Sequence, residues 1–165
     1  MSEQLLPGYH IRRGSILERF LLVKFMQRTY QDLFPRQDFS HLARTVEQYF
    51  CEDTPLWWVE LLGERDSPKI PVACVWVGNA IDQVQGYRHA HIFLLYVVPE
   101  HRRRGIGTAL MNYVENWAIE RGDGQIGLQV FTSNPGALNL YNHLGYQTQS
   151  LWMVKSLHRN QSGDT

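Results

Sequence analysis

The segment best suited to chemistry is a run rich in arginine and glycine that extends from Val97 to Gly107. An apolar, strand-like run precedes it and a helical pattern follows, so the segment should lie at a helix N-terminus. There, unpaired backbone N–H groups and the positive end of the helix dipole attract an anion. Gly105 and Gly107 would let a bulky anion approach the backbone, and the arginines at 102–104 add charge suited to phosphate. The segment therefore predicts a phosphate-binding loop.

Two other phosphate-binding motifs do not fit this loop. A Walker loop ends in Gly-Lys-Ser/Thr, whereas this chain has Gly107-Thr108-Ala109. A dinucleotide fingerprint needs a third glycine at position 110, where Leu110 stands. A surface turn that uses its glycines only for close packing is the alternative interpretation.

The order of patterns around the loop predicts a mixed α/β domain. The first helix should open at a capping box formed by Ser15 and Glu18, and the last with Asn134 as N-cap before Pro135. The strand at 89–98 is apolar enough to be covered on both faces. Strands are expected at 9–12, 56–62, 71–77, 89–98, 125–131 and 149–154, and helices at 15–30, 41–50, 106–122 and 134–145.

Composition limits the classes of protein that remain. A chain of 165 residues with 44% hydrophobic residues can bury one core, and we expect a single domain at 1–157 with a polar tail at 158–165. Sixteen basic and sixteen acidic residues cancel, which disfavours a nucleic-acid binder driven by bulk charge. The two cysteines, Cys51 and Cys74, form neither a disulfide framework nor a metal-ligand pattern. No secretion signal or membrane span is evident, so we expect a cytoplasmic protein. Because the cysteines lack the spacing of metal ligands, we expect no metal.

Two segments of the chain resemble the GNAT superfamily of acyl-CoA N-acetyltransferases. The first is similar to the acyl-CoA loop of that family: Val97-x-Pro99-x-x-Arg102-x-x-Gly105-x-Gly107. The second is similar to another conserved segment of the family: Asn134-x-x-Ala137-x-x-Leu140-Tyr141, followed by Gly145-Tyr146. The resemblance covers about residues 89–154. It implies a GNAT-like fold, in which a mostly antiparallel sheet contains a splayed parallel strand pair and is flanked by about four helices.

The resemblance also implies which residues hold the donor, acetyl-CoA. Pantetheine would fill a gap between the strands at 89–98 and 125–131, where Val97 would pair with it and the Leu95 N–H would face the thioester oxygen. Asn134 would contact the coenzyme in addition to capping its helix. The pyrophosphate would lie on the backbone N–H groups of Arg102, Arg103, Arg104, Gly105, Ile106, Gly107 and Thr108.

Tyr141 stands where the family has its general acid. Acetyl transfer to an amine requires that the departing thiolate be protonated or stabilised, and a phenol can donate a proton to sulfur at neutral pH. A purely structural role is the alternative, because Leu138, Tyr141 and Leu144 also form one face of a helix.

His91 is the expected general base. An amine, with a free pKa of about 10, must lose a proton before it attacks. Some family members carry Glu or His four residues before the position of Leu95, and an imidazole can accept a proton directly or through water. His89, on the same strand face, is the reserve candidate, and Glu60 is a weaker one. A water chain without a dedicated base is the alternative.

The acceptor is not specified by the sequence. In this family the first two helices and their loop shape the acceptor pocket, and here they carry aromatic and acidic residues that would suit a cationic amine. Core packing and surface charge explain the same residues: Tyr30, Asp32, Phe34, Asp38, Phe50, Glu52 and Asp53.

The function that the resemblance implies is acetyl transfer from acetyl-CoA to a primary amine of a small molecule or a peptide. A non-catalytic acyl-CoA-binding sensor or interaction module is the alternative. A homodimer is compatible with the family, whereas a membrane or nucleic-acid partner is not expected.

Overall fold

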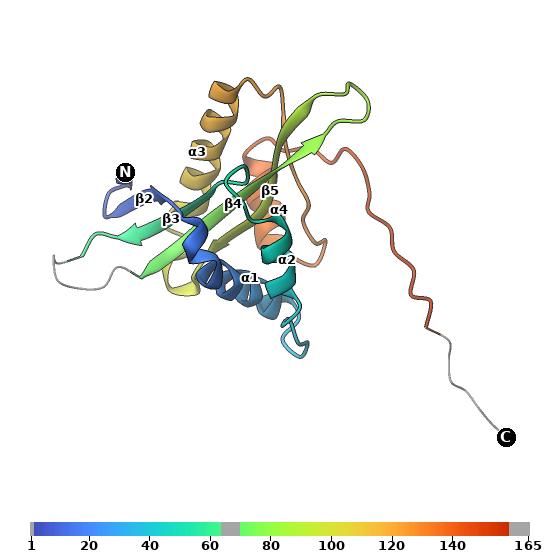
Figure 1. The fold of residues 1–165 in the computed structure, drawn as a ribbon, viewed down its shortest axis with the longest axis horizontal. Helices are drawn as coiled ribbons and strands as arrows, with labels where there is room; N and C mark the ends of the chain where they lie inside the picture. Colours follow the sequence, from blue (N-terminus) through green and yellow to red (C-terminus); the bar gives the residue numbers. More distant parts are fainter. Residues whose placement is uncertain (1, 64–69, 159–165) are drawn as a thin grey trace.

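The computed structural model describes residues 2–63 and 70–158, so most of the expected polar tail lies outside the described residues (Figure 1). One sheet has the strand order β1-β2-β3-β4-β5-β6, antiparallel except for the parallel β5–β6 pair. The strands are β1 (Ser2–Leu6), β2 (Tyr9–Arg13), β3 (Leu56–Leu61), β4 (Pro71–Ile81), β5 (Arg88–Val97) and β6 (Ile126–Leu128). The helices are η1 (Ile16–Glu18), α1 (Arg19–Leu33), α2 (Leu42–Tyr49), η2 (Pro99–His101), α3 (Ile106–Arg121) and α4 (Pro135–His143).

Helices cover both faces of the sheet, as expected for its apolar strands. One core lies between the sheet and α3, and the other between the sheet and α1 with α2. Because side chains alternate along a strand, neighbouring residues of β3 enter different cores. Trp57 belongs to the α3 side and Trp58 to the side of α1 and α2, and both are buried.

The helix ends follow the local signals in the sequence. The Leu17 N–H donates to Ser15 Oγ at 3.1 Å and the Ser15 N–H donates to Glu18 Oε1 at 2.8 Å, which is the expected capping box. The box opens η1, which leads directly into α1. Gly122 ends α3 with a φ of 93°, a left-handed conformation that glycine adopts readily.

Two ends of the sheet differ from the sequence-based prediction. An additional strand, β1, pairs with β2 by its backbone, and its largely exposed side chains gave no apolar pattern to detect. The predicted strand at 149–154 is wrong, because these residues form neither strand nor helix and lie exposed. The strand predicted at 125–131 is confined to β6, and residues after Leu128 form a loop.

A β-bulge divides β5 into two parts. Trp76 of β4 pairs with Leu94 and Val77 pairs with Ile92, so Phe93 lies outside the ladder. The extra residue reverses the alternation of faces. As a result Ala90 and Ile92 enter the α3 core, whereas Leu94 and Tyr96 enter the core of α1 and α2.

The ring of Phe93 lies where a side chain at Gly78 would be. A Cβ at Gly78 would come within 2.0 Å of Phe93 Cζ, so the bulge requires glycine at this position of β4. The ring also packs against Trp76 and His91, with centroids 4.9 and 5.9 Å away. The bulge therefore determines the direction in which the candidate site residues of β5 point, both before Phe93 and after it.

Candidate active site

The second half of β5 has an edge that no described strand covers. Pairing with β6 extends only from Ala90 to Ile92, and β6 ends at Leu128, opposite Ile92, so a gap without a described strand partner lies beside β5 after the bulge. The Val98 N–H donates to Val72 O of β4 at 2.9 Å. Because N–H groups alternate in direction along a strand, those of Leu95 and Val97 point away from β4, toward the gap. The gap therefore exposes a strand edge that an amide-containing chain can pair with.

The loop after β5 presents backbone N–H groups at the start of α3. Arg103 has a φ of 63° and Gly105 a φ of 83°, and left-handed residues turn successive N–H groups toward a common concavity. The Ala109 N–H makes a helical hydrogen bond with Gly105 O at 3.0 Å. The N–H groups of residues 106–108 precede it and have no place in the helical ladder. This geometry provides donors for an anion.

Two of the three arginines in the loop are held by other parts of the chain. The Arg102 N–H donates to Pro99 O at 3.2 Å, and its guanidinium donates to Val97 O at 2.8 Å and to Asp32 at 3.1 Å. Arg104 donates to the Tyr9 hydroxyl at 2.9 Å. Among the described residues, Arg103 alone of the three makes no side-chain hydrogen bond or ion pair. Its guanidinium is therefore available to an incoming anion.

Leu140 of α4 packs close to the start of α3, and Asn134 caps α4. Asn134 Oδ1 accepts a hydrogen bond from the Ala137 N–H at 3.2 Å, which confirms its predicted role as N-cap. A Cβ at Gly107 would come within 3.3 Å of Leu140 Cδ2, so a larger residue there would press on α4. This contact gives Gly107 a packing role beside any role in binding.

Tyr141 lies partly buried on α4. Burial raises the pKa of Tyr141 to about 12, so the phenol is protonated at neutral pH. Its ring packs edge-on against Tyr146, with centroids 5.8 Å apart. The Tyr146 hydroxyl donates to Glu115 at 2.9 Å, whereas no hydrogen-bond partner for the Tyr141 hydroxyl occurs in the part of the chain that the structure describes. Tyr141 thus keeps a proton that it can donate.

His89 and His91 lie on the same face of β5, as predicted from the alternation of side chains. A Cβ at Gly127 of β6 would come within 3.2 Å of His89 Cε1 and 3.5 Å of His91 Nδ1, so this glycine leaves room for both rings. His89 is buried, with Nδ1 2.9 Å from Ala90 O, and His91 is partly exposed. Burial, with a smaller contribution from His89, lowers the pKa of His91. A neutral, accessible imidazole can accept a proton.

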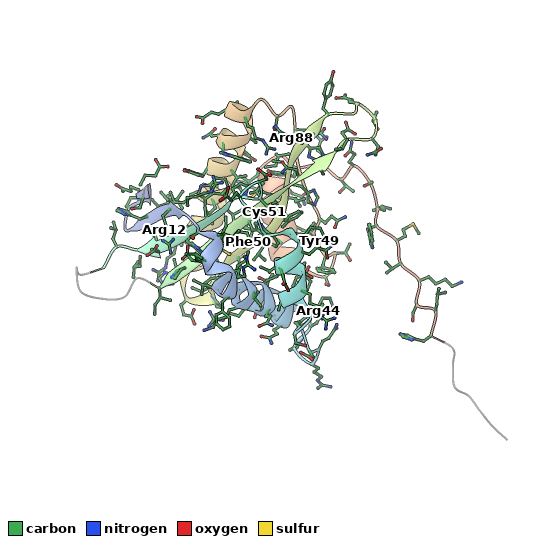
Figure 2. All side chains as sticks on the ribbon, viewed as in Figure 1. Arg12, Arg44, Tyr49, Phe50, Cys51 and Arg88 are labelled. Carbon is green, nitrogen blue, oxygen red and sulfur yellow. The ribbon has the colours of Figure 1, made fainter. Side chains whose placement is uncertain are left out.

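Glu60 lies in an ion-pair network near the opposite edge of the sheet. Its carboxylate is buried and pairs with Arg12, which is labelled in Figure 2. Arg12 also binds Glu18 at 2.7 Å, and this hydrogen bond lowers the pKa of Glu18. The network joins β2, β3 and η1, so the Glu60 carboxylate has a structural role there.

The residues expected to shape an acceptor pocket fall into two groups. The first is an aromatic cluster beside the loop after β6. Tyr30 and Phe34 pack on Phe131, with centroids 6.1 and 5.4 Å away, and Tyr30 also packs on Phe39. Phe131 was not predicted as a site residue, because the sequence pattern places it in the strand expected at 125–131, whereas it lies in the loop after β6. Asp32 pairs with Arg102 close to this cluster. The cluster therefore joins the end of α1 to the loop after β6.

The other acceptor candidates do not join this cluster. Phe50 is buried against Trp76, and Figure 2 shows it with Tyr49 and Cys51 at the C-terminal end of α2. Asp38 accepts a hydrogen bond from the Ser40 N–H at 2.9 Å in the turn before α2. Glu52 and Asp53 are exposed.

Comparisons with known proteins show which proteins this chain resembles in sequence and in fold. A model of the "Acetyltransferase (GNAT) family" matches residues 22–146. An "Uncharacterized N-acetyltransferase" of Methanocaldococcus jannaschii is 35% identical over 78 residues, which cover 47% of this chain and 33% of that protein. The chain spans 33% to 48% of the length of three curated relatives that it matches.

Solved structures share the fold over nearly their whole length. The structure "Putative acetyl transferase from Pyrococcus furiosus" has a TM-score of 0.70 and 28% identity, covering 90% of this chain and 99% of that one. An acetyltransferase from Clostridium acetobutylicum, solved "with acetyl-CoA", has a TM-score of 0.70 and 20% identity, covering 90% and 96%. These similarities confirm the expected fold, with its parallel strand pair within a mostly antiparallel sheet.

Two further features bear on the type of site. No group of three or more His, Cys, Asp or Glu side chains within residues 2–63 and 70–158 is arranged to hold a metal ion. None of the helices in the same ranges combines the length and apolar character needed to cross a bilayer.

Proposed function

This chain belongs to the acetyltransferase (GNAT) family, and we propose that it transfers an acetyl group from acetyl-CoA to a primary amine of a small molecule or a peptide. One observation carries the proposal: the left-handed loop at the start of α3 lies directly after the strand edge that faces the gap beside β6. A diphosphate and an extended amide chain need these two features side by side. The relative from Clostridium acetobutylicum, which was solved with acetyl-CoA, supports this choice of donor.

In this proposal the donor is bound mainly by backbone groups. The N–H groups of residues 103–108 hold the pyrophosphate, and Arg103 adds a mobile charge. The side chains of Arg102 and Arg104 hold the loop in place while adding positive charge beside it. Pantetheine pairs with the open edge of β5 at Val97. Asn134 contacts the coenzyme in addition to capping α4.

The chemical step needs an oxyanion donor and an acid. The amine nitrogen attacks the thioester carbonyl carbon, and the Leu95 N–H stabilises the negative charge that develops on the carbonyl oxygen. When the C–S bond breaks, the sulfur receives the proton of Tyr141. The phenol is protonated at neutral pH, as this step requires.

The acceptor amine gives its proton to His91, directly or through water. The lowered pKa of His91 keeps the imidazole neutral at pH 7, so it can accept a proton. Activity is then lost on acidification, when the imidazole itself becomes protonated. His89 is less suited because its Nδ1 is already in contact with a backbone carbonyl in a buried position.

This assignment predicts a specific pH profile. In wild type, kcat/KM should fall as the pH drops through a value below 6.5, the ordinary pKa of histidine. His91→Gln should lower kcat/KM by about 100-fold and remove that acid limb. His89→Gln is the matched control and should keep the limb. An unchanged acid limb in His91→Gln would show that the base is a different group or a water chain.

The acceptor would approach from the side of α1 and the loop after β6. The aromatic residues Tyr30, Phe34 and Phe131 lie there together with the carboxylate of Asp32. Aromatic faces and a carboxylate attract a cationic amine. A second copy of the chain is a further proposed partner, which the exposed apolar residues near the C-terminus support.

The direct test is a screen of acetyl-CoA against amino acids, polyamines, aminoglycosides and peptide N-termini. Release of free coenzyme A thiol in the presence of one amine class is the expected result. If the chain binds acetyl-CoA but no amine in the screen releases thiol, the proposed transfer is contradicted and a non-catalytic binding module is favoured.

A further inference from the structure

A tyrosine of β2 reaches the segment that leads from η2 into α3. We call this segment, residues 101–105, the entry loop. Tyr9 is the first residue of β2, which is separated from β5 in the sheet by β3 and β4. Its hydroxyl oxygen lies 2.9 Å from His101 Nδ1 and 2.9 Å from a guanidinium nitrogen of Arg104. One hydroxyl group therefore contacts the entry loop at two places.

The chemistry of the three groups gives both hydrogen bonds a direction. A guanidinium has donors and no acceptor, so the Tyr9 oxygen accepts from Arg104. The hydroxyl proton is then free to go to His101 Nδ1, which accepts it in the tautomer that carries its own proton on Nε2. Within residues 2–63 and 70–158, the side chains of His101 and Arg104 have no other hydrogen-bond partner. Both side chains are thus held by Tyr9.

The entry loop has a backbone conformation that its sequence does not favour. Arg103 has a φ of 63° and is the only residue other than glycine with a positive φ in the described part of the chain. A side chain with a Cβ disfavours this left-handed region, so the conformation persists only where the surrounding structure enforces it. Arg103 lies between His101 and Arg104. The Tyr9 hydroxyl is therefore placed to enforce the turn.

Packing and strand pairing fix the position of Tyr9 itself. The residue is 6% exposed and belongs to the core between the sheet and α3. Its backbone pairs with Leu6 of β1 and Leu61 of β3, and its ring meets His101 edge-on with centroids 5.7 Å apart. Because the ring is already ordered by the core, holding the loop costs little further side-chain entropy.

We propose that Tyr9 is a positioning residue for donor binding. Through His101 and Arg104, its hydroxyl holds the entry loop in the conformation that presents backbone N–H groups to a diphosphate. This role rests on the proposed binding of acetyl-CoA. Without the hydroxyl, the entry loop populates other conformations, and the donor binds only to the fraction of molecules in which the loop is correctly formed.

Isothermal titration of the full chain with acetyl-CoA measures the effect. Tyr9→Phe removes the hydroxyl and keeps the ring in the core, and it should weaken binding about tenfold. Tyr113→Phe is the matched control, because the Tyr113 hydroxyl joins α3 to Glu3 of β1, at 2.7 Å, and makes no hydrogen bond to the entry loop. This variant should bind acetyl-CoA like wild type.

NMR order parameters of the free chain separate a local effect from a general loss of structure. In Tyr9→Phe the backbone order parameters of residues 101–105 should fall from about 0.85 toward 0.6. Those of residues 110–114 in α3 should stay as in wild type, since these residues are held by the core.

The outcomes distinguish the role of Tyr9 from the proposed function. If wild type binds acetyl-CoA and Tyr9→Phe binds it equally well, the positioning role is overturned and the proposed function stands. Weaker binding without a loss of order confined to the entry loop would also overturn the positioning role. A wild type that does not bind acetyl-CoA would contradict the proposed function itself, and the role of Tyr9 with it.

Discussion

Replacing Tyr141 with phenylalanine should lower kcat by about 100-fold or more and leave the affinity for acetyl-CoA nearly unchanged. The substitution removes the only proton that the side chain can give to the departing sulfur. The ring stays, so its contact with Tyr146 and the packing of α4 should be retained. Steady-state kinetics give kcat, and calorimetry gives the affinity for the donor separately.

Tyr146→Phe is the control for this experiment. The Tyr146 hydroxyl donates to Glu115, and its ring packs on Tyr141 itself, so the variant loses a partly buried phenol hydroxyl without losing the proposed acid. Its kcat should stay within a few-fold of wild type. Undiminished turnover in Tyr141→Phe would leave Tyr141 with a structural role only, and solvent would then have to protonate the thiolate.

Replacing Gly78 with alanine should destabilise the fold by about 1–3 kcal/mol. The new methyl group would occupy the position of the Phe93 ring, with 2.0 Å to Cζ, and the ring would have to leave the bulge. Since Phe93 packs against His91, turnover should fall as well. Chemical denaturation measures the stability, and the kinetic assay measures the turnover.

A double-mutant cycle isolates the clash. In a Phe93→Ala background the ring is absent, so adding Gly78→Ala should cost far less than it does in wild type. Equal costs in the two backgrounds would mean that the alanine acts on β4 itself, independently of the bulge. No loss of stability in Gly78→Ala alone would mean that Phe93 is not held there.

The sequence predicted the parts of the site that depend on local backbone rules. Asn134 before Pro135 and Ser15 before Glu18 are short-range signals for helix starts, and both are present as expected. Gly105 was expected directly before the helix at 106–122, and it is the N-cap of α3, where the structure shows a φ of 83°. Such features need only a few neighbouring residues, so no knowledge of the remaining fold is required to place them.

Features that depend on contacts between distant segments were not predicted. The bulge at Phe93 exists because the ring fits over Gly78, fifteen residues earlier and on another strand. Arg102 appeared as one of three equivalent charges, yet it binds Asp32 of α1. The run at 149–154 has the composition of a strand, but composition does not supply the partner that a strand needs.

Isothermal titration of the full chain with acetyl-CoA tests whether backbone N–H groups around Gly105 bind a diphosphate. Wild type should bind with a dissociation constant in the micromolar to sub-millimolar range. Gly105→Val should weaken binding by about tenfold or more, since a branched side chain disfavours the φ of 83° that orients these groups. Circular dichroism would confirm that the variant is folded. A folded wild type that gives no heat with acetyl-CoA, or a folded Gly105→Val that binds equally well, would show that these N–H groups do not bind the donor.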